Sequence, residues 1–294
     1  MITYKYRQVD GLNVFYREAG NRHNETLVLL HGFPSSSHMF RNLMAQLEDG
    51  FHLIAPDYPG FGNSDAPAPE SFVYTFDHLS EIIEKLLVSL GIDRFGLFIQ
   101  DYGAPVGLRI ACRHPEWIDA LISQNANAYE EGFSGVWDAL RALWQNRNSE
   151  TETPVRNFLT PEGTVWIYTE GTRNRESISP DNWNIDLAHL NRSGNDRIQL
   201  DLFYDYRCNV ELYPRWQAYF REHQPRSLIV WGRNDPIFTQ AGALAFQKDL
   251  RNAEVHLLDT GHFALEEDCD VIAGLIRQCY ATRVQPVTTT LSTI

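Results

Sequence analysis

One short segment constrains the fold of this chain more than any other. Residues 95–99 form an apolar run typical of a buried strand, and residues 103–107 are small residues that include Pro105, which is tolerated in a first helical turn. Asp101 lies between the two. A strand that turns at once into a helix pushes the side chain at the bend out beyond the carboxyl end of a parallel sheet. This segment alone fits either a helix-capping aspartate or a reactive carboxylate.

Strand and helix patterns alternate on both sides of this segment. The apolar runs of strand length are 26–30, 51–56, 95–99, 120–124, 227–232 and 254–258, and helical periodicity follows several of them. Asp10-Gly11 separates two alternating runs near the N-terminus and predicts an opening hairpin. This order favours a mostly parallel sheet with helices on both faces.

The alternation stops in the middle of the chain and then resumes. Residues 128–222 are rich in Trp, Tyr, Asn and Arg, and Trp137 and Trp144 fall at helical spacing. We therefore predict a core of residues 1–127 and 223–294, with residues 128–222 forming a helical cap, or lid, over the sheet.

Composition excludes several classes of partner. The chain has 294 residues, 43% of them apolar, and a net charge of −13. So acidic a chain would be repelled by nucleic acid and by anionic membranes, and no apolar run is long enough to cross a bilayer. Four scattered cysteines without a CxxC pair, and an N-terminus without a signal-like apolar stretch, favour free thiols, no thiolate metal site and a cytoplasmic location.

Two segments carry weaker signals. Residues 169–186 are polar and rich in turn formers, so we expect a loop there. Residues 281–294 are rich in Thr and Val without helical periodicity. That tail fits either a disordered end or an arm that packs on a second copy of the chain, which leaves a homodimer open.

Three chemistry-bearing residues follow predicted parallel strands. They are Asp101, Asp235 and His262. Ligands of open α/β sheets lie at this edge, and the order nucleophile, acid, histidine is the one that α/β-hydrolases use. The chain contains no Gly-x-Ser-x-Gly segment, so Asp101 stands where a serine nucleophile would stand.

The sequence resembles the α/β-hydrolase superfamily, in the branch of epoxide hydrolases and haloalkane dehalogenases. Five motifs carry the resemblance in the right order: His31-Gly32-Phe33-Pro34, Asp57-Tyr58-Pro59-Gly60-Phe61-Gly62-Asn63-Ser64, Gln100-Asp101-Tyr102-Gly103, Trp231-Gly232-Arg233-Asn234-Asp235 and Gly261-His262-Phe263. It implies an α/β-hydrolase fold with a mostly parallel eight-stranded sheet flanked by helices and a helical cap insertion. It also implies a cis Phe33–Pro34 bond and no metal or organic cofactor.

The resemblance assigns a role to each site residue. Asp101 is the nucleophile, His262 the general base that activates water, and Asp235 the acid that orients the imidazole. The backbone N–H groups of Phe33 and Tyr102 form the oxyanion hole. A carboxylate is ionised at neutral pH and can attack a saturated carbon directly, and the resulting ester is then hydrolysed by water.

The leaving group depends on the cap. A lid tyrosine can protonate the oxygen of an opening epoxide, and Tyr206 in its Tyr-Arg step is the predicted donor, with Tyr204 as the fallback. The predicted pocket residues are Phe33, Trp137, Trp144, Tyr204 and Phe263. Such an aromatic pocket favours an apolar small molecule, with water as the second substrate.

Epoxide hydrolysis to a diol is the leading prediction. The alternatives are haloalkane dehalogenation, ester or lactone hydrolysis, and a non-catalytic ligand-binding protein of the same fold. Dehalogenases of this branch usually carry a Trp after the nucleophile and often an Asn after His-Gly, whereas this chain has Tyr102 and Phe33 there. We expect His31 and Asp57 to be structural.

Overall fold

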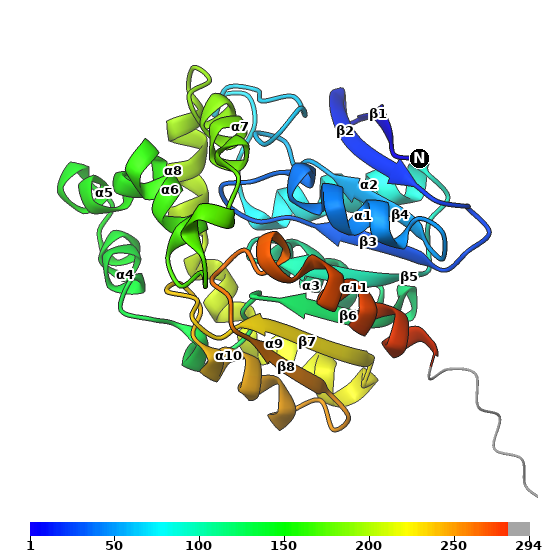
Figure 1. The fold of residues 1–294 in the computed structure, drawn as a ribbon. Coiled ribbons are helices and arrows are strands. Elements are labelled where there is room, and N and C mark those ends of the chain that lie inside the picture. The colour runs from blue at the N-terminus through cyan, green and yellow to red at the C-terminus, as the bar shows by residue number, and fades with distance from the viewer. Residues whose placement is uncertain (282–294) are drawn as a thin grey trace, which may run out of the picture.

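The predicted sheet is confirmed. The computed structural model describes residues 1–281, so the predicted arm lies outside the described residues except for its first residue. Within that range eight strands form one sheet in the order β1-β2-β4-β3-β5-β6-β7-β8 (Figure 1). The strands are β1 (Thr3–Val9), β2 (Leu12–Ala19), β3 (Thr26–Leu30), β4 (His52–Pro56), β5 (Phe95–Gln100), β6 (Ile118–Gln124), β7 (Arg226–Gly232) and β8 (Glu254–Leu258). The β1–β2 and β2–β4 pairs are antiparallel, and the pairs from β4 to β8 are parallel.

Helices cover both faces of the sheet. α1 (Arg41–Leu47) packs with α11 (Leu265–Ala281) on one face, while α2 (Phe76–Ser89), α3 (Gly103–Arg113) and α9 (Arg207–His223) lie together on the other (Figure 1). α10 (Gln240–Ala245) packs beside β7. The strands between these layers are almost entirely buried, as near-continuous apolar runs require in a parallel sheet.

The turn from β5 to α3 is tight and strained. Asp101 has φ of 48°, a left-handed conformation that costs about 1–3 kcal/mol in a non-glycine residue. The helix can approach the sheet only because its first residues are small. A Cβ on Gly103 would lie 2.3 Å from the Leu30 carbonyl oxygen, and one on Gly107 would lie 2.8 Å from Ile99 Cγ2.

The cap segment, residues 128–222 between β6 and β7, is helical as predicted. Its helices are α4 (Trp137–Gln145), α5 (Ser149–Arg156), α6 (Pro161–Thr169), α7 (Pro180–Leu190), α8 (Asn195–Asp205) and the greater part of α9. Residues 170–174 form the loop expected over residues 169–186, but a short 3-10 turn and α7 follow it, because the Ser179 side chain caps a helix whose first residue is Pro180.

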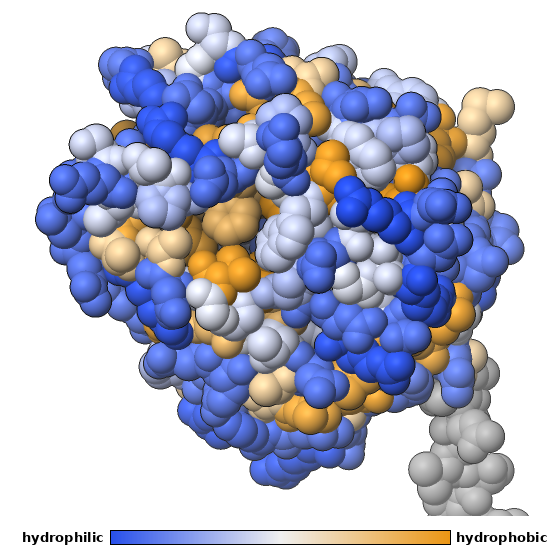
Figure 2. Space-filling model, turned by 60° about the vertical axis from the view of Figure 1, so that its left-hand side comes forward, coloured by the Kyte–Doolittle hydropathy of each residue, from blue (hydrophilic) through white to orange (hydrophobic). Residues whose placement is uncertain are grey.

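Hydrogen bonds fasten the cap segment to the core. Arg192 donates to the carbonyls of Gly60 and Gly62 at 3.0 Å each, and Asn195 donates to Gly60 at 2.8 Å. Figure 2, turned toward the cap side, shows a hollow with apolar surface at its floor and hydrophilic residues around it. The cap segment is therefore bonded to the loop that follows β4, and it covers the carboxyl ends of the parallel strands.

Candidate active site

Two of the predicted site residues form a buried pair. His262 Nδ1 and Asp235 Oδ2 are 2.8 Å apart, and both side chains are fully buried. The other carboxylate oxygen of Asp235 accepts a hydrogen bond from the Ile237 N–H at 2.7 Å. An acceptor held this way fixes the imidazole with its Nδ1 proton toward Asp235 and leaves Nε2 as the reactive nitrogen.

Asn125 supports this pair from the neighbouring strand end. Its Nδ2 donates to Asp235 Oδ2 at 2.8 Å, and its Oδ1 accepts from the Gly232 N–H at 2.9 Å. No role was assigned to Asn125 from the sequence. The missed signal was its position directly after a buried strand, where a polar side chain can orient another.

Asp101, the predicted nucleophile, lies at the floor of the site. Its Oδ1 accepts a hydrogen bond from the Phe33 N–H at 2.7 Å, and the Tyr102 N–H also stabilises the ionised form. Burial raises the pKa of Asp101 to about 6, while His262 and these two N–H groups counteract that rise. Both predicted oxyanion-hole donors thus face the same carboxyl group.

Opposing effects act on the pKa of His262. Burial lowers its pKa, but the adjacent Asp235 and the nearby Asp101 outweigh that effect and raise the pKa above the ordinary histidine value. The Gln100 side chain also contacts the ring, with its Nε2 2.9 Å from His262 Nε2. Sequence analysis did not single out this glutamine.

Asp101 opens into an apolar pocket whose empty volume, with its open mouth included, is about 440 Å³. Its lining comes from the core and from four cap elements: Phe33, Asp101, Tyr102, Val136, Trp137, Leu140, Phe158, Ile167, Phe203, Tyr206 and Ile237. Phe33 and Trp137 were predicted for this pocket. Asp101 is the one residue of the lining that carries a carboxylate, so the cavity offers an apolar molecule a single ionised group.

Two tyrosine hydroxyls in this lining lack hydrogen-bond partners. Those of Tyr206 and Tyr102 are both buried with no partner within hydrogen-bond distance, although the Tyr213 hydroxyl lies near that of Tyr206. Burial raises the pKa of each well above the ordinary tyrosine value, and Tyr213 adds to the effect at Tyr206. The hydroxyls therefore stay protonated. Tyr102 was predicted only for its backbone N–H, and its hydroxyl was missed.

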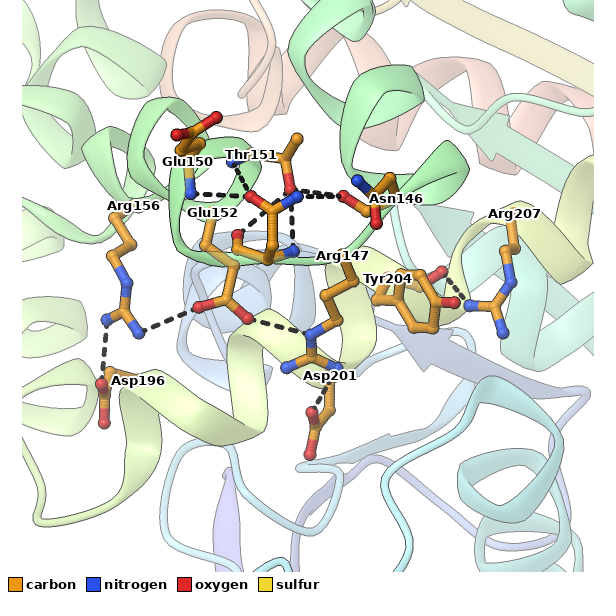
Figure 3. Close-up of polar contacts among 11 residues, drawn as sticks. Asn146, Arg147, Glu150, Thr151, Glu152, Arg156, Asp196, Asp201, Tyr204 and Arg207 are labelled. Atoms are coloured by element: carbon orange, nitrogen blue, oxygen red, sulfur yellow. Dashed lines mark hydrogen bonds and ion pairs between the residues drawn. The ribbon is translucent and has the colours of Figure 1, made fainter.

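Three predicted pocket residues lie outside this lining. Trp144 donates its indole N–H to the Phe203 carbonyl at 2.8 Å. Tyr204 lies beside two guanidinium groups in a cap network (Figure 3), with Arg207 3.6 Å and Arg147 5.3 Å from its ring centre. Phe263 instead stacks on a cap residue, Tyr168, with ring centres 4.0 Å apart.

His31 and Asp57 have structural surroundings, as expected. Asp57 accepts hydrogen bonds from the backbone N–H groups of Ser37 at 2.7 Å and Asn63 at 2.8 Å, which ties two loops together. The buried His31 ring stacks on Tyr58. The Phe33–Pro34 bond is cis. Among residues 1–281, no group of three or more His, Cys, Asp or Glu side chains is placed to hold a metal ion.

The fold and this site define a class of protein. Residues 25–268 match the α/β hydrolase fold family. The chain therefore belongs to that family of hydrolases. In the described range, none of the helices combines the length and apolarity that a bilayer span needs.

The chain is also similar to individual proteins of known sequence or structure. The chain is 43% identical over 282 residues to an uncharacterised hydrolase of Saccharomyces cerevisiae, covering 95% of this chain and 97% of that one. A haloalkane dehalogenase, DbeA from Bradyrhizobium elkani, has a similar structure with TM-score 0.75 at 24% identity, covering 96% and 100% of the two chains. An epoxide hydrolase, CorEH, gives TM-score 0.78 at 19% identity, covering 96% and 100%. Both structures show likeness of fold.

Proposed function

We propose that this chain hydrolyses its substrate through a covalent ester on Asp101, and that the substrate is an apolar epoxide opened to a diol. One contrast in the cavity supports this choice of leaving group. The Tyr206 and Tyr102 hydroxyls are buried and unpaired, whereas the indole N–H groups of Trp137 and Trp144 are already bonded to the carbonyls of Ile237 and Phe203.

The first step forms the ester. An oxygen of the Asp101 carboxylate attacks one epoxide carbon, and the bond from that carbon to the epoxide oxygen breaks. Tyr206 gives its hydroxyl proton to the departing oxygen, so the ring opens to a hydroxyl group rather than to a free alkoxide. The Tyr102 hydroxyl lines the same cavity from the core side and is a second donor for the departing oxygen.

The second step hydrolyses the ester. Water attacks the Asp101 carboxyl carbon, and His262 Nε2 takes a proton from that water. The N–H groups of Phe33 and Tyr102 stabilise the negative charge that develops on the carboxyl oxygen. Collapse releases the diol, which receives the proton from the imidazolium, and the proton left on Asp101 restores Tyr206. Epoxide and water are thus consumed and a diol is formed.

A dehalogenase site needs N–H donors at the departing ion. Both indoles are committed to backbone carbonyls at 3.0 Å and 2.8 Å, so neither is free to bind a halide without breaking a bond to the protein. The residue after Asp101 is Tyr102, which has no ring N–H. These observations favour oxygen over halogen as the leaving atom.

The decisive experiment is a substrate panel with the intact enzyme. Apolar epoxides, haloalkanes and esters of similar size are compared, and diol formation is measured beside halide release. We expect turnover of epoxides and no halide above background. Halide release with no diol would overturn the choice of leaving group.

A second measurement tests the covalent route itself. After a single turnover in heavy-oxygen water, the peptide containing Asp101 should carry the label, because water attacks the carboxyl carbon of the ester. Label found in the product alone would overturn the ester mechanism.

A further inference from the structure

Gln100 holds an unexpected place beside the candidate base. It is the last residue of β5, directly before Asp101, and its side chain is fully buried. Its Nε2 lies 2.9 Å from His262 Nε2, the nitrogen that must accept a proton from water. Both ring nitrogens of His262 therefore have a partner, Asp235 on one side and Gln100 on the other.

The partners fix which atoms carry protons. Asp235 Oδ2 accepts from His262 Nδ1, and its other oxygen is taken by the Ile237 N–H, so Nδ1 bears the ring proton. His262 Nε2 then has a lone pair, and the Gln100 amide donates to it. A hydrogen bond to the neutral form of a base favours that form. Gln100 thus opposes Asp235 and Asp101, which together favour the charged ring.

The same lone pair is needed by water. It can accept one hydrogen at a time, so the attacking water and the Gln100 amide compete for it. The amide oxygen is buried without a partner and packs against Gly32. The Gln100 amide and the Asp101 carboxylate both lie close to Gly32. A Cβ added to Gly32 would be 2.6 Å from the amide oxygen and 2.5 Å from Asp101 Oδ1.

Glutamine can serve both protonation states of the ring. Its last torsion joins an sp³ to an sp² carbon and turns easily, and half a turn exchanges the N–H donor for the carbonyl acceptor. The donor fits neutral His262, and the acceptor fits the imidazolium that exists after water has lost its proton. A glutamate could only accept, and a methionine offers neither interaction.

We propose that Gln100 is a positioning residue for hydrolysis of the Asp101 ester: its amide keeps His262 Nε2 free of a proton in the resting enzyme and yields that nitrogen to the attacking water. This inference rests on the proposed function, since it needs an ester on Asp101. In the step itself a water O–H bond breaks, a bond forms from its oxygen to the Asp101 carboxyl carbon, and the proton goes to His262 Nε2.

The test compares two substitutions at position 100 with a matched control. The control is Gln199 in α8, a buried glutamine whose Nε2 donates to Asn195 Oδ1 at 3.1 Å rather than to the His262 ring or its partners. Rapid mixing with a styrene-oxide-type epoxide, followed by mass measurement of the Asp101 peptide, gives the rates at which the adduct forms and decays across pH.

We expect a shift in the pH profile of adduct decay. In Gln100→Met the pH of half-maximal decay should rise by about half to one unit, the size of one hydrogen bond to the neutral ring. In Gln100→Glu, nearly the same shape as glutamine, it should rise further, by more than about one unit. Gln199→Met should leave this pH unchanged. An unshifted profile in both Gln100 variants would overturn the proposal.

A readout without substrate covers the case in which one variant does not fold. Nitrogen NMR of histidine-labelled resting enzyme reports the protonation of His262 directly, and Gln100→Glu should hold the ring charged to higher pH than the wild type does. The two proposals fail separately. Absence of any Asp101 adduct in the wild type and in His262→Gln would reject the covalent route, whereas a normal adduct with unshifted decay in the Gln100 variants would reject the role of Gln100 alone.

Discussion

The cavity has a floor, formed by Asp101 and the strand ends around it, and a roof, formed by cap residues such as Trp137 and Tyr206. The two are built differently. On the floor, each polar group of the His262–Asp235 pair has partners fixed by strand ends, and Asp101 is held by the Phe33 N–H. The roof is aromatic, comes from cap helices, and leaves the Tyr206 hydroxyl unpaired. The His262–Asp235 pair is complete before a substrate arrives, whereas the Tyr206 and Tyr102 hydroxyls are left for a substrate to bond.

This difference separates two chemical functions of the site: forming and hydrolysing the ester, and stabilising the departing atom. A carboxylate, an imidazole and two N–H groups can make and break an ester whatever atom departs. The departing atom must be stabilised by other groups, the hydroxyls of Tyr206 and Tyr102. Substitutions of Asp101, Asp235 or His262 should therefore affect every substrate alike, and substitutions that remove either hydroxyl should discriminate among leaving groups.

The largest effect is expected from removing the floor carboxylate. Asp101→Asn keeps the shape of the side chain and tolerates the left-handed backbone, but it offers no anion to attack carbon. Steady-state epoxide turnover should fall by at least about ten-thousand-fold. Diol formation at an ordinary rate would show that attack does not come from this residue.

The next effect is a trapped intermediate. His262→Gln removes the base but not the nucleophile, so ester formation should continue while its hydrolysis slows by about a thousand-fold. Mass measurement of the intact protein should show one substrate bound per chain. If turnover is normal and no adduct accumulates, another group activates water.

Roof substitutions come third. Tyr206→Phe keeps the ring that packs 4.6 Å from Trp137 and removes only the proton donor. Epoxide opening should slow by about a hundred-fold, with the adduct decaying at the usual rate. Tyr204→Phe is the matched control, since Tyr204 lies outside the cavity lining. An equal loss of activity in that variant would contradict the role of Tyr206 as the proton donor.

The pH dependence of ester formation should be smaller but specific. Asp101 attacks only when ionised, and burial raises its pKa to about 6. The rate of adduct formation should therefore be constant above that pH and fall about tenfold for each unit below it. A rate that stays level down to pH 4 would mean that the carboxyl group retains an ordinary pKa.

The smallest effect concerns a roof indole. Trp144→Phe loses the hydrogen bond to the Phe203 carbonyl, which should lower the free energy of unfolding in urea by about 1 kcal/mol beyond the loss of ring packing. The ratio of epoxide to haloalkane turnover should not move. A change in that ratio would place this indole at the leaving group.

The sequence predicted the floor far better than the roof. Asp101, Asp235 and His262 could be found because each follows a run whose pattern already indicates a buried parallel strand. Position on the sheet edge then brings them together. Asn125 and Gln100 stand at the same edge, but their roles depend on which nitrogen and oxygen they touch, and no pattern of residues contains that information.

The roof depends on packing between helices. Helical spacing predicted α4, yet Trp137 lines the cavity while Trp144, from the same helix, does not. Which one faces inward is decided by the other cap helices. α7 was missed for a related reason: its polar sequence has little helical periodicity, and its cap at Ser179 and burial against the cap segment stabilise it.

Under the proposed reaction, the apolar cavity holds the substrate and the product to different extents. An epoxide exposes mainly carbon and gives up little hydration when it moves among side chains such as Leu140 and Phe203. A diol carries two hydroxyl groups that such walls cannot satisfy, so bulk water competes strongly for it. The walls that admit the reactant thus drive out what is made from it, and accumulating diol should inhibit the enzyme only weakly.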